Sequence, residues 1–306
     1  MAARIIFFGT TGAFSASTLD ALLAEIIPAA VVLPALSAHA KGLRHLRAPA
    51  TAPVLGRRLP AYRQALPTIV TQAHVMGIPV YELGNDASAV EGVRALMPQL
   101  CAVACWPKKV TPSLLAVPRL GWLNVHPALL PRHRGPDPLF WTFHAGETET
   151  GVTVHQMAEA LDTGDIVAQQ RVTIAPGEAE AALEQRLATA GGALLAEAIR
   201  ALTDGTAVFT PQDESQASWE GWPTADDYTV RTGWSARRAY VFATGMRERA
   251  EPVTVAINGK VYRIAHVVGY EETGAYASDE PRIVDASSLF FSRPDGVMSA
   301  HVIPEA

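Results

Sequence analysis

The sequence predicts an α/β protein, in which a doubly wound, Rossmann-like parallel sheet is followed by a small β-rich C-terminal domain. Three features of the 306 residues support this prediction. Short apolar runs alternate with segments of helical periodicity through the first two thirds of the chain, and these runs are apolar at nearly every position. Strands buried on both faces of a parallel sheet have that pattern. The last third of the chain has the signals of β-hairpins instead.

The first half of the chain supplies the alternation. A strand is expected at residues 4–8, and the helical spacing of Leu19, Leu22, Leu23, Ile26 and Ile27 predicts a helix after it. Ser15 or Ser17 would cap this helix. A second strand is expected at residues 29–33, followed by a long irregular segment up to residue 66, and such loops are typically functional. Helices at 68–76 and 86–97, a short helix begun by Pro112, and strands at 78–83, 100–106 and 122–126 then follow.

In the second half, the sequence pattern changes after residue 204. Residues 151–174 are strand-like, and residues 178–202 predict a long helix that buries Leu183, Leu187, Leu194, Leu195, Ile199 and Leu202. We expect a first domain at 1–205, a linker at 206–220 and a C-terminal OB-like β domain at 221–306. Asn258-Gly259 between two apolar runs predicts a tight hairpin. A second hairpin is expected at residues 293–296 and a helix near residues 235–243.

Composition excludes several classes of protein. With 49% hydrophobic and 18% charged residues, the chain is neither disordered nor a disulfide-stapled miniprotein. Its most apolar stretch, residues 26–36, contains two prolines and is far shorter than the ~20 residues that span a bilayer. No secretory segment is evident at the start, so we expect no membrane association and a cytoplasmic location. Cys101 and Cys105 lie in an apolar run and are expected to be small core residues.

The charge is distributed unevenly. No Asp or Glu occurs between Glu25 and Glu82, whereas residues 41–63 hold a basic segment made of Lys41, Arg44, Arg47, Arg57, Arg58 and Arg63. A block of one sign is commonly a solvated loop. The alternative is an arm that contacts an anion such as phosphate or nucleic acid.

Two polar residues at a strand end are candidates for chemistry. Asn124 and His126 are two residues apart at the end of the strand expected at 122–126, so their side chains share a face. An amide and a protonated imidazole can stabilise an oxyanion during acyl transfer, and Asp162 in the turn LDTGD is a candidate to orient the imidazole. Each residue also has a purely structural interpretation as a turn or capping group. The nine His and two Cys residues show no zinc-ligand spacing, so no metal is expected.

A family resemblance distinguishes between these interpretations. The run NVHPALLPRHRG, followed by GVTVHQM and LDTGD, resembles the signature of the 10-formyltetrahydrofolate-dependent formyltransferases. The start of the chain, RIIFFGTTGAFSASTLDALL, and the segment DDYTVRTGWSARRAY are most similar to the methionyl-tRNA-formylating members. The resemblance implies the formyltransferase fold, with a catalytic first domain, and it matches the family's Asn-x-His and later Asp to Asn124, His126 and Asp162.

The resemblance also implies a mechanism and a co-substrate. Asn124 and protonated His126 would stabilise the oxyanion while the acceptor amine attacks, and Asp162 would hold His126 charged. The co-substrate would be 10-formyltetrahydrofolate. Its pterin would lie along residues 106–110, with contacts from Trp106 and Val110 on one side and Met157 on the other. Lys108 and Lys109 are candidates to meet the glutamate tail of the folate; the alternative is that they are simply solvated.

Several departures from the family pattern leave the acceptor open. Residues 211–306 carry 14 acidic and 9 basic side chains, whereas tRNA binding favours a basic face. The Pro-Trp-Pro-Gly-Ala type segment of the family is replaced by MRERAEPVT. His155 matches a histidine of members that formylate small molecules, and otherwise it is a strand residue facing solvent. The acceptor is therefore either initiator methionyl-tRNA or a small amine, such as an amino sugar or an ornithine-like compound. A formyltetrahydrofolate hydrolase and a silent folate-binding relative are further alternatives.

Overall fold

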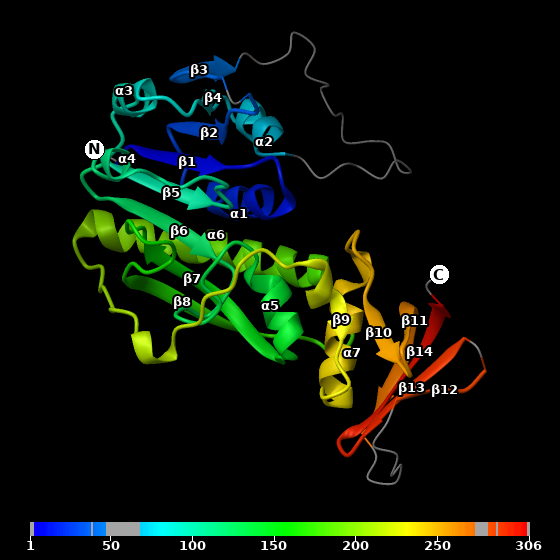
Figure 1. Ribbon diagram of the computed structural model, residues 1–306. Helices are drawn as coiled ribbons and strands as arrows, with labels where there is room; N and C mark the ends of the chain where they lie inside the picture. Colours follow the sequence, from blue (N-terminus) through cyan, green and yellow to red (C-terminus); the bar gives the residue numbers. More distant parts are fainter. Residues whose placement is uncertain (1–2, 38, 47–67, 273–280, 286, 305–306) are drawn as a thin grey trace, which may run out of the picture. The chain divides into compact units, whose positions relative to one another are not determined.

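The computed structural model describes residues 3–37, 39–46, 68–272, 281–285 and 287–304, which form two compact units (Figure 1). Unit 1 comprises Met1–Arg132, Val152–Gln170 and Gln185–Ala217. Unit 2 comprises His133–Gly151, Arg171–Glu184 and Ser218–Ala306. Within the described ranges, no helix combines the length and the apolar character needed to cross a bilayer.

An eight-stranded sheet is the centre of unit 1, in the order β3-β4-β2-β1-β5-β6-β7-β8. Its middle is parallel, as predicted, because strands apolar at every position are buried on both faces. The parallel strands are β1 (Ile5–Gly9), β2 (Ala30–Pro34), β4 (Val80–Leu83), β5 (Leu100–Ala104) and β6 (Trp122–His126). The strands β3 (Leu43–Leu46) and β7 (Glu149–Gln156) pair antiparallel with β4 and β6, and β8 (Ile166–Thr173) lies beyond β7. The doubly wound sheet is thus confirmed at its centre and has antiparallel additions at both sides.

Helices cover both faces of this sheet. Side chains of α3 (Ser88–Ala95) and α4 (Pro112–Leu115) pack in the core cluster that contains Ile6, Phe8 and Trp122. On the other face, α1 (Ala13–Leu23) contacts α2 (Ile69–Val75), and α6 (Glu180–Asp204) approaches both α1 and the Val125 side chain. Because β-strand side chains alternate, Asn124 and His126 lie on the face of Trp122, away from α6.

Three predictions about unit 1 need correction. The helix α1 begins at Ala13 after Gly12, so Ser15 does not cap it; its Oγ instead donates to the Ala104 carbonyl at 2.7 Å. The chain leaves β5 at Cys105, which has a left-handed φ of 62° and is exposed, so only Cys101 is a core residue. Burial raises the pKa of the Cys101 thiol.

The third correction concerns the segment expected to be irregular. Residues 43–46 form β3 because their backbone completes a ladder with β4, and the Arg44 side chain forms an ion pair with Glu82. Lys41 lies just before this strand. Arg47, Arg57, Arg58 and Arg63 lie outside the described residues. Among the described residues of the basic segment, Arg44 is therefore already paired with a carboxylate of the same protein.

Unit 2 contains a six-stranded sheet in the order β12-β13-β14-β11-β10-β9. Its strands are β9 (Thr229–Val230), β10 (Thr254–Ile257), β11 (Lys260–Glu271), β12 (Arg282–Ile283), β13 (Ser288–Arg293) and β14 (Gly296–Pro304). Both hairpin predictions are confirmed. Asn258 and Gly259 have φ values of 50° and 75° and join β10 to β11, as a tight hairpin turn requires, and residues 294–295 join β13 to β14.

An aromatic cluster holds the helices of unit 2 together. The helix α7 (Ala236–Gly245) is capped by Ser235, whose Oγ accepts from the Arg238 N–H at 3.1 Å, and α5 (Pro138–Ala145) packs against it. The ring centroids of Phe140 and Phe242 are 5.6 Å apart. Burial, together with the charge of Arg238, lowers the pKa of His144 to about 4. Short 3₁₀ turns lie at Ala225–Tyr228 and Met246–Glu248 in this unit and at Glu214–Gln216 in unit 1.

One arginine organises the polar part of unit 2. Arg249 belongs to the segment MRERAEPVT, which departs from the resembled pattern. Its guanidinium donates to both Asp137 carboxylate oxygens, at 2.7 and 2.8 Å, and to both oxygens of Glu180. It also lies 5.3 Å from the Phe140 ring centroid. Asp137 at the same time caps α5. The altered segment therefore links α7, α5 and the start of α6 within this unit.

His133 forms a second charged cluster in unit 2. Its Nε2 lies 3.2 Å from Glu147 Oε1, and its Nδ1 lies 3.5 Å from Glu220 Oε1. Burial alone disfavours the charged imidazole, but the hydrogen bonds and charges of the two glutamates outweigh it and raise the pKa of His133 to about 9. This histidine is thus held as a buried cation.

Candidate active site

The polar residues at the end of β6 face a second strand that supplies one of their partners. In the antiparallel pair of β6 and β7, Asn124 lies opposite His155 and His126 lies opposite Thr153. Directly opposite residues point to the same face of a sheet. His126 and His155 are 4% and 1% exposed, and their ring centroids are 6.3 Å apart. The solvent-facing alternative for His155 is therefore wrong, because β7 is covered on this face.

Asp162 approaches both imidazoles from the loop between β7 and β8. One carboxylate oxygen lies 3.7 Å from His126 Nδ1, and the other lies 3.6 Å from His155 Nε2. Both separations are longer than strong hydrogen bonds. The Asp162 side chain is 5% exposed. The structure thus brings Asn124, His126 and Asp162 together, as expected, and adds His155.

Gln212 and Gly164, the glycine of the LDTGD turn, hold the Asp162 loop. Gln212 Nε2 donates to the backbone carbonyls of Asp162 and Gly164, at 2.8 and 2.7 Å. A Cβ atom at Gly164 would overlap the carbonyl oxygen of Gln156, so only glycine permits this approach of the loop to β7. The motif LDTGD contains the signal for Gly164. Nothing in the sequence points to Gln212, which is 50 residues away from Asp162.

The hydrogen bonds of His155 connect it to Asn124. Its Nδ1 lies 2.9 Å from the backbone oxygen of Gln156, and its Nε2 lies 3.1 Å from Asn124 Nδ2. Asn124 itself is half-buried. An amide N–H, two imidazoles and a carboxylate therefore converge at the carboxyl end of a central strand, where doubly wound sheets bind their ligands.

The residues expected to contact the folate pterin lie on the same face. Trp106 and Met157 are partly buried and pack against the core cluster of β1, β5 and β6, and the Trp106 ring meets Phe8 edge to face at 5.4 Å. Val110 is 5% exposed and belongs to that cluster itself. Trp106 and Met157 thus remain partly exposed, whereas Val110 is buried within the cluster.

The two lysines expected near the folate tail differ. The Lys108 ammonium donates to Asn85 Oδ1 at 2.6 Å and to the Ala35 carbonyl at 3.4 Å. Lys109 is exposed. Lys108 is therefore engaged in linking loops of unit 1, and Lys109 is the more accessible cation.

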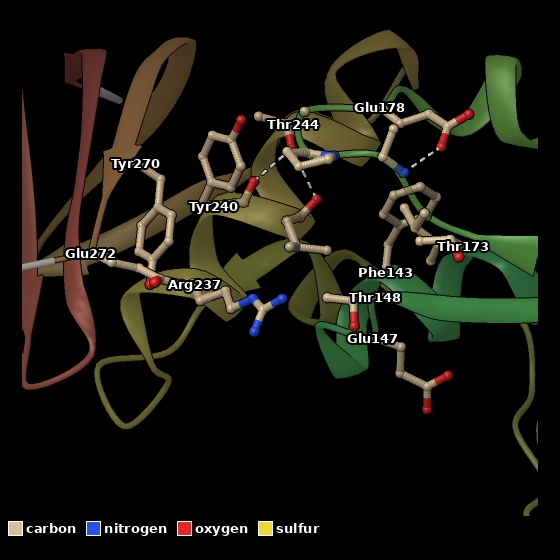
Figure 2. Close-up of a pocket in the computed structure, with 15 residues that line it drawn as sticks. Phe143, Glu147, Thr148, Thr173, Glu178, Arg237, Tyr240, Thr244, Tyr270 and Glu272 are labelled. Carbon is tan, nitrogen blue, oxygen red and sulfur yellow. Dashed lines mark hydrogen bonds between the residues drawn. The ribbon is translucent and has the colours of Figure 1, made fainter.

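A separate cavity of about 540 Å³ lies within unit 2 (Figure 2). Tyr240 and Tyr270 stack on one side of it with ring centroids 5.5 Å apart, and Phe143 lies on the other side. Two of its carboxylates have partners in the protein, since Glu147 holds His133 and Glu178 accepts from the Ala175 N–H. Its lining does not include the amide, imidazole and carboxylate groups of unit 1.

The fold and the polar set of unit 1 together define the class of protein: an α/β protein with an amide, two imidazoles and a carboxylate at the carboxyl end of a strand, residue types suited to acyl transfer. The family model described as Formyl transferase matches residues 3–199. The chain belongs to this formyl transferase family.

Curated relatives agree with this family. The methionyl-tRNA formyltransferases of Syntrophus aciditrophicus, Pelotomaculum thermopropionicum and Anaeromyxobacter dehalogenans are 36%, 32% and 36% identical over 62%, 70% and 70% of this chain. The matched part spans 60%, 68% and 64% of the lengths of these relatives.

Solved structures show the same fold. An N-formyltransferase from Helicobacter canadensis, in complex with folinic acid and dTDP-3-aminofucose, is similar over 99% of this chain and all of its own, with a TM-score of 0.68 at 12% identity. The phosphoribosylglycinamide formyltransferase from Streptococcus pneumoniae is similar over 66% of this chain and 99% of its own, with a TM-score of 0.51 at 22% identity.

Proposed function

We propose that this protein is an enzyme that transfers a formyl group from 10-formyltetrahydrofolate to an acceptor amine. The observation that carries this proposal is the convergence of Asn124, His126 and Asp162 at the carboxyl end of β6. Membership of the formyl transferase family and the names of the curated relatives support it.

The polar residues would stabilise the negative charge that develops on the formyl oxygen and would accept a proton from the amine. Bound 10-formyltetrahydrofolate supplies the electrophilic formyl carbon. Asn124 would donate an amide N–H to the formyl oxygen as negative charge develops on it, and protonated His126 would place a second donor there. Asp162, 3.7 Å from His126 Nδ1, would balance the imidazolium charge and accept a proton on its way from the attacking amine.

The partly exposed apolar side chains on this face of the sheet would suit a flat bicyclic ring. Trp106 and Met157 would contact the pterin, with Val110 supporting it from the core. Lys109, being exposed, would meet the glutamate tail more readily than Lys108, whose ammonium is already bonded within unit 1. The set provides no Ser, Cys or Lys nucleophile, which suits direct attack by the acceptor.

Initiator methionyl-tRNA is the first acceptor to test, because three curated relatives are named for it. A small amine is the second, and two features favour it. Residues 211–306 are acidic, with 14 acidic against 9 basic side chains, and Arg44 in the basic segment is paired with Glu82. Both features weaken the attraction for a polyanion.

Tetrahydrofolate release from 10-formyltetrahydrofolate tests the proposal. The purified protein is assayed with initiator methionyl-tRNA, with a panel of amino sugars and other amines, and with no acceptor. Turnover that depends on an acceptor supports the transferase and identifies the acceptor class. Release without acceptor indicates a hydrolase, and no release under any condition indicates a silent relative.

Variants at the polar set test the assignment of roles. Because one oxyanion donor contributes about 100- to 1,000-fold in rate, Asn124→Ala and His126→Ala should each lose at least about 100-fold. The exposed β7 residue Glu149, replaced by Gln, is the matched control and should keep wild-type turnover. Turnover within about tenfold of wild type in either site variant would contradict the assigned roles.

A further inference from the structure

His155 is the one member of the buried polar set to which the acyl-transfer scheme gives no task. It is 1% exposed, lies directly opposite Asn124 across the β6–β7 pair, and has hydrogen-bonding neighbours at both ring nitrogens. A buried imidazole with two defined neighbours has a defined tautomer, which in turn dictates what its neighbours can donate or accept.

The neighbour of Nδ1 fixes that tautomer. A backbone carbonyl only accepts hydrogen bonds, so Nδ1, 2.9 Å from the Gln156 oxygen, carries the proton. In the neutral ring, Nε2 then has a lone pair. The Asn124 Nδ2 atom, 3.1 Å away, donates to that lone pair.

The direction of the Asn124 amide follows from this bond. If the amide were turned over, its oxygen would face the Nε2 lone pair, and the hydrogen bond would be replaced by a repulsion between two acceptors. The charged groups facing His155 are the Asp162 carboxylate, 3.6 Å from Nε2, and the His126 ring. The Asp162 oxygen lies farther from Nε2 than the Asn124 amide nitrogen does.

We infer that His155 is a positioning residue that directs the Asn124 amide, so that one N–H is bound to His155 Nε2 and the other is presented to the formyl oxygen. This inference rests on the proposed function. His155 contributes no charge and no proton to the reaction. It determines which end of the Asn124 amide meets the substrate. If the amide were reversed, its oxygen would face the formyl oxygen, and no hydrogen bond could form.

Turnover measurements with paired variants test this role. His155→Met removes the acceptor, and since a misdirected amide forfeits a donor worth about 100- to 1,000-fold, kcat should fall at least tenfold. The KM for 10-formyltetrahydrofolate should stay within about threefold, because the lost interaction belongs to the transition state. His155→Gln restores a hydrogen-bond acceptor at a similar distance from the backbone. It should recover at least about half of the loss in log kcat.

The double variant separates positioning from general loss of structure. In an Asn124→Ala background there is no amide to direct, so adding His155→Met should change kcat less than about twofold. An equal loss in both backgrounds would overturn the inference, and so would wild-type kcat in His155→Met alone.

A spectroscopic measurement covers the case in which His155→Met fails to fold. In ¹⁵N-histidine-labelled wild-type protein, the His155 signals, assigned by their absence from His155→Gln, should show a neutral ring protonated at Nδ1. A ring protonated at Nε2 would overturn the inference. Wild-type protein that releases no tetrahydrofolate with any acceptor would contradict the proposed function instead, which keeps the two failures apart.

Discussion

Replacing Arg249 by methionine should strongly destabilise unit 2. Methionine keeps the length of the side chain but removes the charge and all donors. Asp137 and Glu180 would lose a cation that bonds to both oxygens of each carboxylate, and they are only 12% and 16% exposed. Two carboxylates would then face each other without compensation, next to Glu184.

The magnitude follows from this geometry. Removing one partner of a buried ion pair costs about 3–5 kcal/mol, because the remaining charge is left desolvated. The Arg249 side chain is 22% exposed, so solvent would partly screen the two carboxylates. We therefore expect a loss of about 3 kcal/mol in the free energy of unfolding. Burial and the nearby Glu180 already raise the pKa of Glu184, which shows that this region disfavours further negative charge.

Urea denaturation at pH 7, followed by circular dichroism and by the fluorescence of the buried Trp234, measures the loss. Arg247→Met is the matched control, because that guanidinium donates to backbone carbonyls and is about half exposed. It should cost less than about 1 kcal/mol. Adding Asp137→Asn and Glu180→Gln to Arg249→Met removes the orphaned charges and should recover most of the stability. A loss below about 1 kcal/mol in Arg249→Met, or no recovery in the triple variant, would refute the reasoning.

Two further predictions concern the charged and close-packed positions described above. His133 has a folded-state pKa of about 9 against 6.5 for the free side chain, so its contribution to stability is complete below pH 6.5 and is lost as the pH rises through 9. The unfolding free energy, measured by urea titration at a series of pH values, should fall across that window by about 2–4 kcal/mol. His133→Gln should abolish this dependence of the unfolding free energy on pH. Gly164→Ala should displace the Asp162 loop from β7 and lower kcat by at least about tenfold, while a far-ultraviolet spectrum like that of the wild type shows that the fold is kept. Unchanged turnover in Gly164→Ala would mean that the loop accommodates a Cβ atom without moving Asp162.

Local patterns in the sequence predicted most of the architecture. The β6 strand was predicted at residues 122–126 with the bounds it has, because its apolar residues lie in a short run between Gly121 and Pro127. The Asn258-Gly259 turn was equally clear, since only a few residue types tolerate two left-handed positions in succession. The strand at Leu43–Leu46 was not foreseen, because its four residues lack an apolar alternation and are ordered by pairing with β4.

The polar set was predictable only in part, for reasons of register. Alternation along one strand places Asn124 and His126 on one face, but the residue opposite them depends on how β7 aligns with β6, and sequence periodicity does not specify that alignment. His155 was therefore left between two interpretations. The tether from Gln212 and the charge cluster at Arg249 join residues far apart in sequence, and neither leaves a local pattern.

The pairing of Asn124 with His155 also limits how this chain can change in evolution. Inserting or deleting one residue within β7 would move Val154 or Gln156 opposite Asn124 and turn the imidazole to the other face of the sheet. Point substitutions preserve the alignment, whereas changes of length inside the strand do not. Residues 158–161 are exposed, and they lie between β7 and the pinned Asp162. Descendants of this chain should therefore accumulate insertions and deletions in that short stretch, while the lengths of β6 and β7 stay constant.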